Sequence, residues 1–208
     1  MIDPRVRIKM CGMSRVSDIA HATALGVDAI GLIFYPKSRR YLDIMAAKML
    51  LQSLSVFVDV VAVFVNPEAT YVRQVIAELP IQYLQFHGEE SPEFCEQFGK
   101  SYIKAVPAIS ADEITKLADQ HKQATAILLD TPTSSHGGCG MPFDWQIIPR
   151  MLNKPIILAG GLDSFNVGAA IKIGTPYAVD VCSGVEVSPG IKDHVKMSQF
   201  VNTVWGKK

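Results

Sequence analysis

Short apolar runs and helix-like segments alternate from one end of this 208-residue chain to the other. Each apolar run has the length and composition typical of a strand that is buried on both faces of a parallel sheet. The strand-like segments are residues 7–11, 28–34, 58–65, 83–86, 102–106, 126–130, 155–160 and 177–181. The helix-like segments that follow them are residues 16–25, 42–53, 68–79, 91–98, 111–120, 143–151, 164–173 and 192–204.

Eight strand–helix units without a linker predict an α/β protein with one domain, a single (β/α)8 TIM barrel over residues 1–208. The alternative is a doubly wound open sheet, which usually has fewer strands and carries a Gly-rich fingerprint after the first one. Residues 11–14, Cys-Gly-Met-Ser, do not match that fingerprint. The pattern therefore favours the barrel.

Composition and charge narrow the class of protein further. Lys and Arg balance Asp and Glu at 20 each, so a nucleic-acid partner is not expected. The first five residues have no apolar stretch behind their charges, and no apolar run reaches the about 18 residues of a membrane span. The four cysteines lack C-x-x-C spacing. We therefore expect a cytoplasmic, reduced protein that binds neither membrane nor nucleic acid.

Two successive strand ends open into glycine-containing loops. The seventh apolar run ends on Gly160 and Gly161, and the eighth continues into Cys182, Ser183 and Gly184. Glycine lets backbone N–H groups approach an anion closely, and a helix start behind the loop adds further donors. In a βα barrel the last quarter is a common phosphate site. We therefore predict phosphate binding at these loops, although glycines that only form tight turns remain an alternative.

Polar residues stand at several other strand ends, where catalytic groups of such barrels lie. Cys11 ends the first strand, and the alternative is an inert buried thiol. Asp130 ends the sixth strand, where it could instead cap a loop. His87 could be a core histidine with satisfied hydrogen bonds. Arg40 lies in the loop after the second strand and could bind a carboxylate with two parallel hydrogen bonds, or be an ordinary solvated arginine.

Alternation along the strands predicts one buried ion pair. Lys9 lies on the same side of its strand as Cys11, and Asp180 on the same side as Cys182. In a closed barrel the first and last strands are neighbours, so we expect Lys9 and Asp180 to pair inside it. The pair would bring a cation near Cys11 and help to lower the pKa of its thiol.

Nine short motifs occur in one order along the chain. They are KMCGMSR (9–15), GLIFYPKS (31–38), VFVN (63–66), QFHGE (85–89), LLDT (128–131), GGCG (137–140), FDW (143–145), LAGGL (158–162) and AVDVCSGVE (178–186). Each motif alone is weak, but the ordered set resembles the phosphoribosylanthranilate isomerase family over almost the whole chain.

The resemblance implies a (β/α)8 barrel of tryptophan biosynthesis that acts without cofactor or metal. The implied reaction is the Amadori rearrangement of N-(5′-phosphoribosyl)anthranilate to 1-(2-carboxyphenylamino)-1-deoxyribulose 5-phosphate. By the same resemblance Cys11 is the general base, Asp130 the general acid and Arg40 the partner of the anthranilate carboxylate. The phosphate would bind the backbone around Gly160, Gly161, Ser183 and Gly184, with His87 and Asp180 as further substrate-binding residues.

The chemistry fits these residue types. Opening of the ribose ring needs a proton at the ring oxygen, which a carboxylic acid can deliver. Removal of the C2′ proton then needs a base, which a thiolate can be.

The chain departs from the family's pattern at a few positions. Ser14 stands where Thr is usual, and Cys139, Met141 and Pro142 change the loop after the sixth strand. Substrate contacts of that loop are therefore not transferred to this chain.

Two other functions stay open at the level of sequence. The first is another sugar-phosphate isomerase, such as the aminoaldose isomerase of the histidine pathway, which typically has an aspartate where Cys11 stands. The second is a barrel that binds phosphate without catalysis. The expected partner is the small-molecule substrate, and the expected assembly is a monomer or a homodimer.

Overall fold

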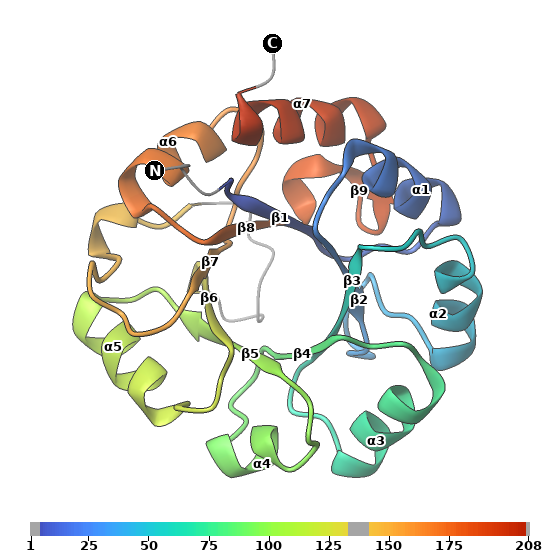
Figure 1. The fold of residues 1–208 in the computed structure, drawn as a ribbon, viewed down its shortest axis with the longest axis horizontal. Helices are drawn as coiled ribbons and strands as arrows, with labels where there is room; N and C mark the ends of the chain where they lie inside the picture. Colours follow the sequence, from blue (N-terminus) through green and yellow to red (C-terminus); the bar gives the residue numbers. More distant parts are fainter. Residues whose placement is uncertain (1–4, 133–141, 207–208) are drawn as a thin grey trace.

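The predicted strands form a closed parallel barrel in the computed structural model, which describes residues 5–132 and 142–206. Strands pair in chain order and the last pairs with the first, so the open-sheet alternative is wrong. The strands are β1 (Arg7–Met10), β2 (Ala29–Ile33), β3 (Asp59–Phe64), β4 (Tyr83–Phe86), β5 (Tyr102–Pro107), β6 (Ala126–Asp130), β7 (Ile156–Leu158) and β8 (Ala178–Val181). Figure 1 looks down the barrel, with the strands as an inner ring.

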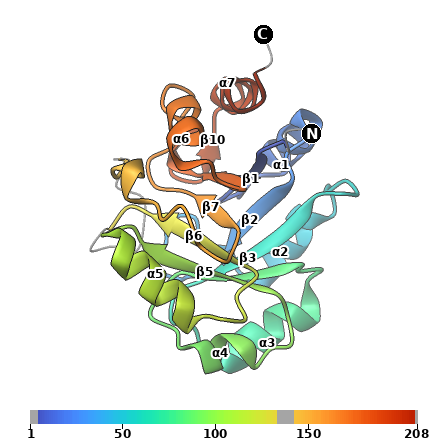
Figure 2. The same cartoon turned by 60° about the vertical axis from the view of Figure 1, so that its left-hand side comes forward.

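Helices surround the barrel and cover its outer face (Figures 1 and 2). Four of the described helices begin at side-chain caps that the sequence provides, Asp43, Ser91, Ser110 and Asp193. The helices are α1 (Val16–Leu25), α2 (Ile44–Leu51), α3 (Ala69–Glu78), α4 (Pro92–Glu96), α5 (Ala111–Gln120), α6 (Val167–Gly174) and α7 (His194–Trp205). Among the described residues, none of these helices has the length and apolar character needed to cross a membrane.

The helix predicted over residues 143–151 is wrong. Of these residues only Trp145–Ile147 are helical, and they form the single 3-10 turn η1. Pro149 explains the early end, because proline disfavours the α conformation of the residue before it and lacks a backbone N–H. Ile148 is accordingly extended, with φ −66° and ψ 122°.

A small hairpin follows β8 that the sequence analysis did not predict. The 3-10 turn η2 (Ser183–Val185) leads into β9 (Glu186–Ser188), which pairs antiparallel with β10 (Ile191–Lys192). The connection turns at Gly190, whose φ of 81° favours glycine. The hairpin matters for function because it carries Glu186 and Lys192 to the edge of the site.

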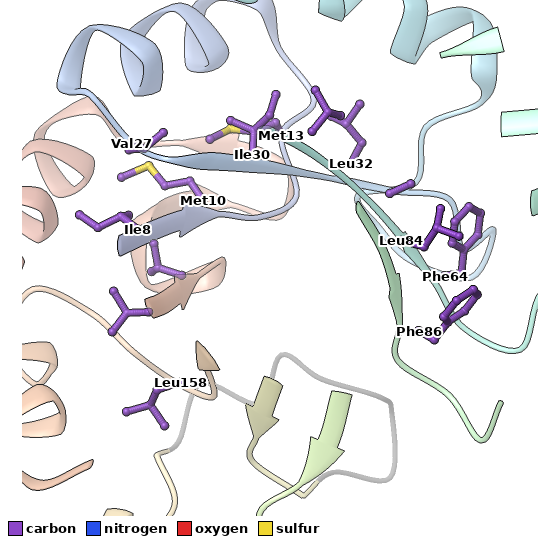
Figure 3. Packing of buried hydrophobic residues seen from close by; sticks show 14 of the residues in the cluster. Ile8, Met10, Met13, Val27, Ile30, Leu32, Phe64, Leu84, Phe86 and Leu158 are labelled. Atoms are coloured by element: carbon purple, nitrogen blue, oxygen red, sulfur yellow. The ribbon is translucent and has the colours of Figure 1, made fainter. Parts of the chain in front are cut away.

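Apolar side chains form two layers, one on each side of the barrel wall. Alternate residues of each strand face outward and pack beneath the helices, as Ile8, Met10 and Leu158 do in Figure 3. The others fill the barrel interior; they are Cys11, Val61, Val63, Ile103, Ala105, Ala126, Leu128, Ile157, Ala159 and Ala178. Since side chains fill the interior, the polar groups gather at its carboxyl-terminal mouth.

Candidate active site

The carboxyl ends of the strands surround a cavity of about 390 Å³. Most of the predicted site residues line it, namely Cys11, Arg40, His87, Asp130, Gly160, Gly161, Asp180 and Ser183. Gly184 is not in the lining and packs instead against the loop after β7. A Cβ atom on Gly184 would lie 1.9 Å from the carbonyl oxygen of Leu162, so only glycine fits there.

Asp130 is held at the end of β6 by hydrogen bonds to both carboxylate oxygens. Nε2 of His87 lies 3.1 Å from Oδ2, and the N–H of Thr131 donates to Oδ1 at 2.8 Å. The other ring nitrogen of His87, Nδ1, lies 3.1 Å from the amide Nε2 of Gln85. An amide nitrogen only donates, so Nδ1 accepts and Nε2 carries the proton toward Asp130. This chain fixes the direction of the Asp130 carboxyl group.

The predicted pairing of Lys9 with Asp180 is confirmed. Nζ of Lys9 lies 2.8 Å from Oδ2 of Asp180, and both side chains are buried. The two residues are opposite one another in the β1–β8 register. The second oxygen, Oδ1, is buried and has no partner among the described residues. Because Asp180 lines the cavity, this oxygen is an unused acceptor at the edge of the site.

Cys11 lies just beyond β1 and is 6% exposed. A hydrogen bond to the thiol of Cys182, together with burial, raises the pKa of Cys11 well above its usual value. Lys9 lowers this pKa, as expected, but its effect is the smaller one. The pair thus brings a cation near Cys11 and helps to lower its pKa as predicted, although the net pKa of the thiol is raised. The positive charge of Lys9 therefore only partly offsets the effects of burial and Cys182, which make the Cys11 thiol harder to deprotonate.

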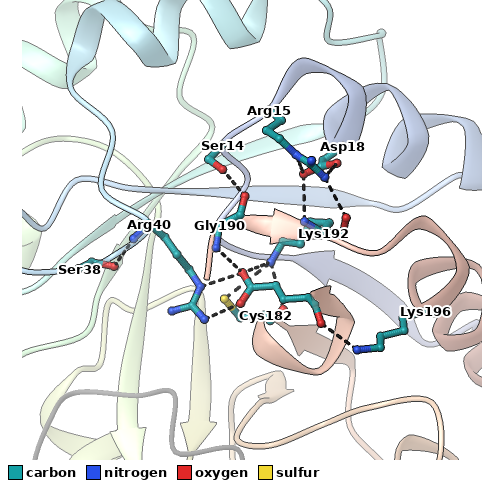
Figure 4. A network of polar contacts seen from close by, with 10 residues as sticks. Ser14, Arg15, Asp18, Ser38, Arg40, Cys182, Gly190, Lys192 and Lys196 are labelled. Atoms are coloured by element: carbon teal, nitrogen blue, oxygen red, sulfur yellow. Dashed lines mark hydrogen bonds and ion pairs between the residues drawn. The ribbon is translucent and has the colours of Figure 1, made fainter. Parts of the chain in front are cut away.

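Arg40 reaches the cavity from the loop after β2, and an acidic partner holds it there. Its Nε donates to Oε1 of Glu186 at 2.8 Å and its Nη2 to Oε2 at 2.5 Å. Nζ of Lys192 also bonds to Oε1, at 3.0 Å, and these groups converge beside Cys182 in Figure 4. Burial raises the pKa of Glu186, but the bonds from Arg40 and Lys192 outweigh it and the net pKa is lowered. One edge of the guanidinium is therefore occupied, and Nη1 has no hydrogen bond to any residue that the structure describes.

The glycine loops have the backbone geometry that close approach of an anion requires. Gly160 and Gly161 adopt φ of 81° and 64°, and neither N–H has an acceptor within the described residues. The helix behind them starts at Val167, later than predicted, and Asp163 already accepts from the N–H groups of Phe165 and Asn166. The loops, more than the helix start, therefore provide free donors.

Sequence reasoning assigned no role to three residues that complete the site. Glu186 and Lys192 orient Arg40, and Cys182 lines the same cavity as Cys11 and raises the pKa of its thiol. Glu186 and Cys182 stood inside a recognised motif, but their partners are far away in sequence. Arg40, for example, is 146 positions from Glu186. Only the hairpin after β8 brings these groups together.

A (β/α)8 barrel with acid–base groups and glycine loops at its carboxyl-terminal mouth defines the class of phosphate-binding barrel enzymes. The family model described as "N-(5'phosphoribosyl)anthranilate (PRA) isomerase" matches residues 8–203. The chain belongs to this isomerase family.

Similar proteins cover the chain from end to end. A relative from Legionella pneumophila (strain Paris), named N-(5′-phosphoribosyl)anthranilate isomerase, is 56% identical over 97% of this chain and 98% of its own length. The crystal structure of phosphoribosyl anthranilate isomerase from Thermotoga maritima is 37% identical, with a TM-score of 0.90 over 97% of this chain and 99% of that one. A further structure is 35% identical, with a TM-score of 0.85 over 97% and 99%. It holds reduced 1-(o-carboxyphenylamino)-1-deoxyribulose 5-phosphate.

Proposed function

We propose that this protein converts N-(5′-phosphoribosyl)anthranilate to 1-(2-carboxyphenylamino)-1-deoxyribulose 5-phosphate, a step of tryptophan biosynthesis. One observation carries the proposal: Cys11 just after β1 and Asp130 at the end of β6 flank β7 and β8, whose glycine loops would bind the phosphate. A phosphate held there places the ribose between the two groups.

Two proton transfers account for the reaction. Asp130 delivers a proton to the ribose ring oxygen as the ring opens and the aminal becomes a Schiff base, while His87 keeps the carboxyl group aimed at the cavity. Cys11 then removes the C2′ proton, and the resulting enolamine tautomerises to the ketone. No electrons leave the substrate, so the rearrangement needs general acid–base groups and no redox cofactor.

Two further contacts would orient the substrate. The Nη1/Nη2 edge of Arg40 would bind the anthranilate carboxylate, since Glu186 takes the other edge. Oδ1 of Asp180, which is buried without a partner in the part of the chain that the structure describes, would accept from a ribose hydroxyl.

The test is an anthranilate-fluorescence assay with freshly prepared substrate on the wild type, Cys11→Ser and Asp130→Asn. A serine hydroxyl is far too weak an acid to become a base here, and asparagine has no transferable proton. We expect kcat to fall by about 10²–10⁴ in each variant while the circular dichroism spectrum is retained.

Activity near that of the wild type in either variant would assign its role to another residue, with His87 and Asp180 the next candidates. The aminoaldose substrate of the histidine pathway is assayed in parallel, and turnover of that substrate alone would favour the rival isomerase. Binding of substrate without turnover would favour a non-catalytic barrel.

We also propose that the enzyme acts in the cytoplasm, as a monomer or a homodimer. Light scattering during size-exclusion chromatography decides between the two assemblies.

A further inference from the structure

Two cysteine thiols meet where the barrel closes. Met10 lies opposite Val181 in the β1–β8 register, and the N–H of Cys11 continues the ladder by donating to the carbonyl of Val181 at 2.8 Å. One residue further on, Cys11 is therefore opposite Cys182. Neighbouring parallel strands are about 4.8 Å apart, which falls within the Cα separations of about 4.4–6.8 Å that a disulfide can bridge.

Both thiols are directed to the same space. They line the same cavity, and each has the largest influence on the pKa of the other. Both are free cysteines in the structure. A small solute that enters the cavity can therefore reach the pair without any opening of the fold.

Cations surround the Cys182 side of the pair. Nζ of Lys192 lies 3.8 Å from Sγ of Cys182, and Arg40 is held close by through Glu186. The hydrogen bond from Cys11, aided by Lys192 and Arg40, lowers the pKa of Cys182 to about 7 despite burial. Cys182 is therefore partly a thiolate at neutral pH, the form that attacks oxidants. Cys95 differs, since burial raises its pKa to about 12.

We propose that Cys182 and Cys11 form a peroxide-reactive pair that closes to a reversible disulfide across the β1–β8 junction. The Cys182 thiolate attacks one oxygen of hydrogen peroxide; an S–O bond forms, the O–O bond breaks, and the leaving hydroxide takes up a proton as water. The Cys11 sulfur then attacks the sulfenic sulfur, an S–S bond forms, and the leaving hydroxide takes the Cys11 proton as a second water. Two thiols lose two electrons and the peroxide gains them.

Disulfide formation would withdraw the sulfur of Cys11 from proton transfer. This consequence rests on the proposed role of Cys11 as the base, whereas formation of the disulfide itself does not. The oxidised protein would therefore be inactive, and a dithiol would restore it through thiol–disulfide exchange.

The experiment treats the full chain with hydrogen peroxide and follows activity and the Cys11–Cys182 linked peptide by mass spectrometry. Cys139, which lies outside the described residues, is replaced by Ser in every protein so that it offers no third thiol. In this background we compare the parent, Cys182→Ser and, as a matched control, Cys95→Ala on α4. Each protein is referred to its own starting activity.

We expect the parent and the Cys95→Ala control to lose activity by on the order of 10²-fold, to contain the linked peptide, and to recover with dithiothreitol. Cys182→Ser should contain no linked peptide and should inactivate at least about tenfold more slowly. A parent without the linked peptide, or equal inactivation rates in the parent and Cys182→Ser, would overturn the inference and leave the proposed function standing. A linked peptide without loss of activity would instead overturn the role of Cys11 and leave the pair standing.

Discussion

At the scale of single residues, the site depends on arginine chemistry that lysine cannot replace. Arg40 uses Nε and Nη2 for Glu186 and, in the proposed function, would offer its Nη1/Nη2 edge to a second carboxylate. A planar guanidinium can serve two carboxylates at fixed angles, whereas an ammonium group is a point charge without that geometry. Glu186 thus positions the group that would bind the substrate.

We predict that Arg40→Lys lowers kcat/KM by roughly 10- to 100-fold, mainly through a higher KM, because a charge-assisted hydrogen bond contributes about 1.5–3 kcal/mol. Steady-state kinetics with anthranilate fluorescence measures the effect. Arg39→Lys is the matched control, since Arg39 also lines the cavity but has no role in the proposal, and it should matter less. Equal losses at the two positions would mean that the loop after β2 was assigned wrongly.

The sequence predicted which residue types stand at the strand ends, but not how they are partnered. The ion pair between Lys9 and Asp180 was predictable, because side-chain alternation along the strands and closure of the barrel suffice to bring the two residues together. The contact between Glu186 and Arg40 was not predictable, since it depends on a hairpin whose short strands lack a clear apolar pattern in the sequence. The net direction of the Cys11 pKa does not follow from Lys9 alone, because its largest cause is the thiol of Cys182 at the end of the neighbouring strand.

At the scale of elements, the glycine loops depend on close packing of one loop against the next. A Cβ on Gly184 would meet the Leu162 carbonyl oxygen at 1.9 Å, and one on Gly160 would meet the backbone N of Thr131 at 2.6 Å. Both neighbours are backbone atoms and cannot rotate away. The loops after β6, β7 and β8 therefore constrain one another.

We predict that Gly184→Ala raises KM for substrate by at least about tenfold and lowers the free energy of unfolding by about 1–3 kcal/mol, because the loop after β8 must shift. Kinetics and urea unfolding measure the two effects. The matched control is Gly168→Ala inside α6, where a Cβ would lie 3.5 Å from Thr203. That variant should be stabilised by about 0.5–1 kcal/mol, and a Gly184→Ala protein of normal KM would contradict the phosphate site.

His121 makes the packing of α5 against β5 sensitive to pH. It is 4% exposed and lies 3.4 Å from the hydroxyl of Tyr102, measured to Nδ1. Burial lowers the pKa of His121 to about 4 from its usual 6.5. Between these pH values the unfolded chain binds a proton that the folded chain does not bind. The free energy of unfolding must therefore fall as pH decreases from 6.5 to 4.

We predict that the wild type loses about 2 kcal/mol more stability between pH 7 and pH 5 than His121→Asn, which cannot titrate. Urea unfolding at the two pH values measures this difference. The values at pH 7 give the packing cost of the substitution separately, since the histidine is neutral there. If the free energies of unfolding of the two proteins change equally between pH 7 and pH 5, His121 binds a proton as readily in the folded state as in the unfolded state.

The sequence largely predicted which strands and helices exist, and it predicted the residues at which they begin and end less well. Every predicted strand exists, because an apolar run bounded by polar turns admits few other structures. The helix predicted over residues 143–151 failed because Pro149 outweighed a favourable apolar pattern. The hairpin after β8 was missed since five residues in two short strands give too little pattern to recognise.

At the scale of the whole molecule, barrel closure brings the two ends of the chain together. β1 pairs with β8 over four registered positions, and Trp205 at the end of α7 donates its indole N–H to the Val6 carbonyl at 3.0 Å. Cys11, Asp180 and Cys182 all lie at this junction. The candidate site therefore forms only when the last strand has joined the first.

The Lys9–Asp180 pair is the buried electrostatic contact of this closure. Burial lowers the pKa of Lys9, but the Asp180 carboxylate outweighs it and the net pKa is raised. Lys9 is therefore charged in the folded barrel. Removing one partner leaves the other charge buried, which costs far more than an exposed ion pair contributes.

We predict that Lys9→Met lowers the free energy of unfolding by about 3–5 kcal/mol, because Asp180 is left as an uncompensated buried charge. Urea unfolding measures the loss. The double variant Lys9→Met with Asp180→Asn should recover part of it, since the amide carries no charge. Lys116→Met is the matched control: Lys116 is 65% exposed and 3.6 Å from Glu113, so its stability should change by less than about 1 kcal/mol. If the loss of stability in the double variant equals the sum of the losses in Lys9→Met and Asp180→Asn, the two residues contribute through packing and not through the interaction of their charges.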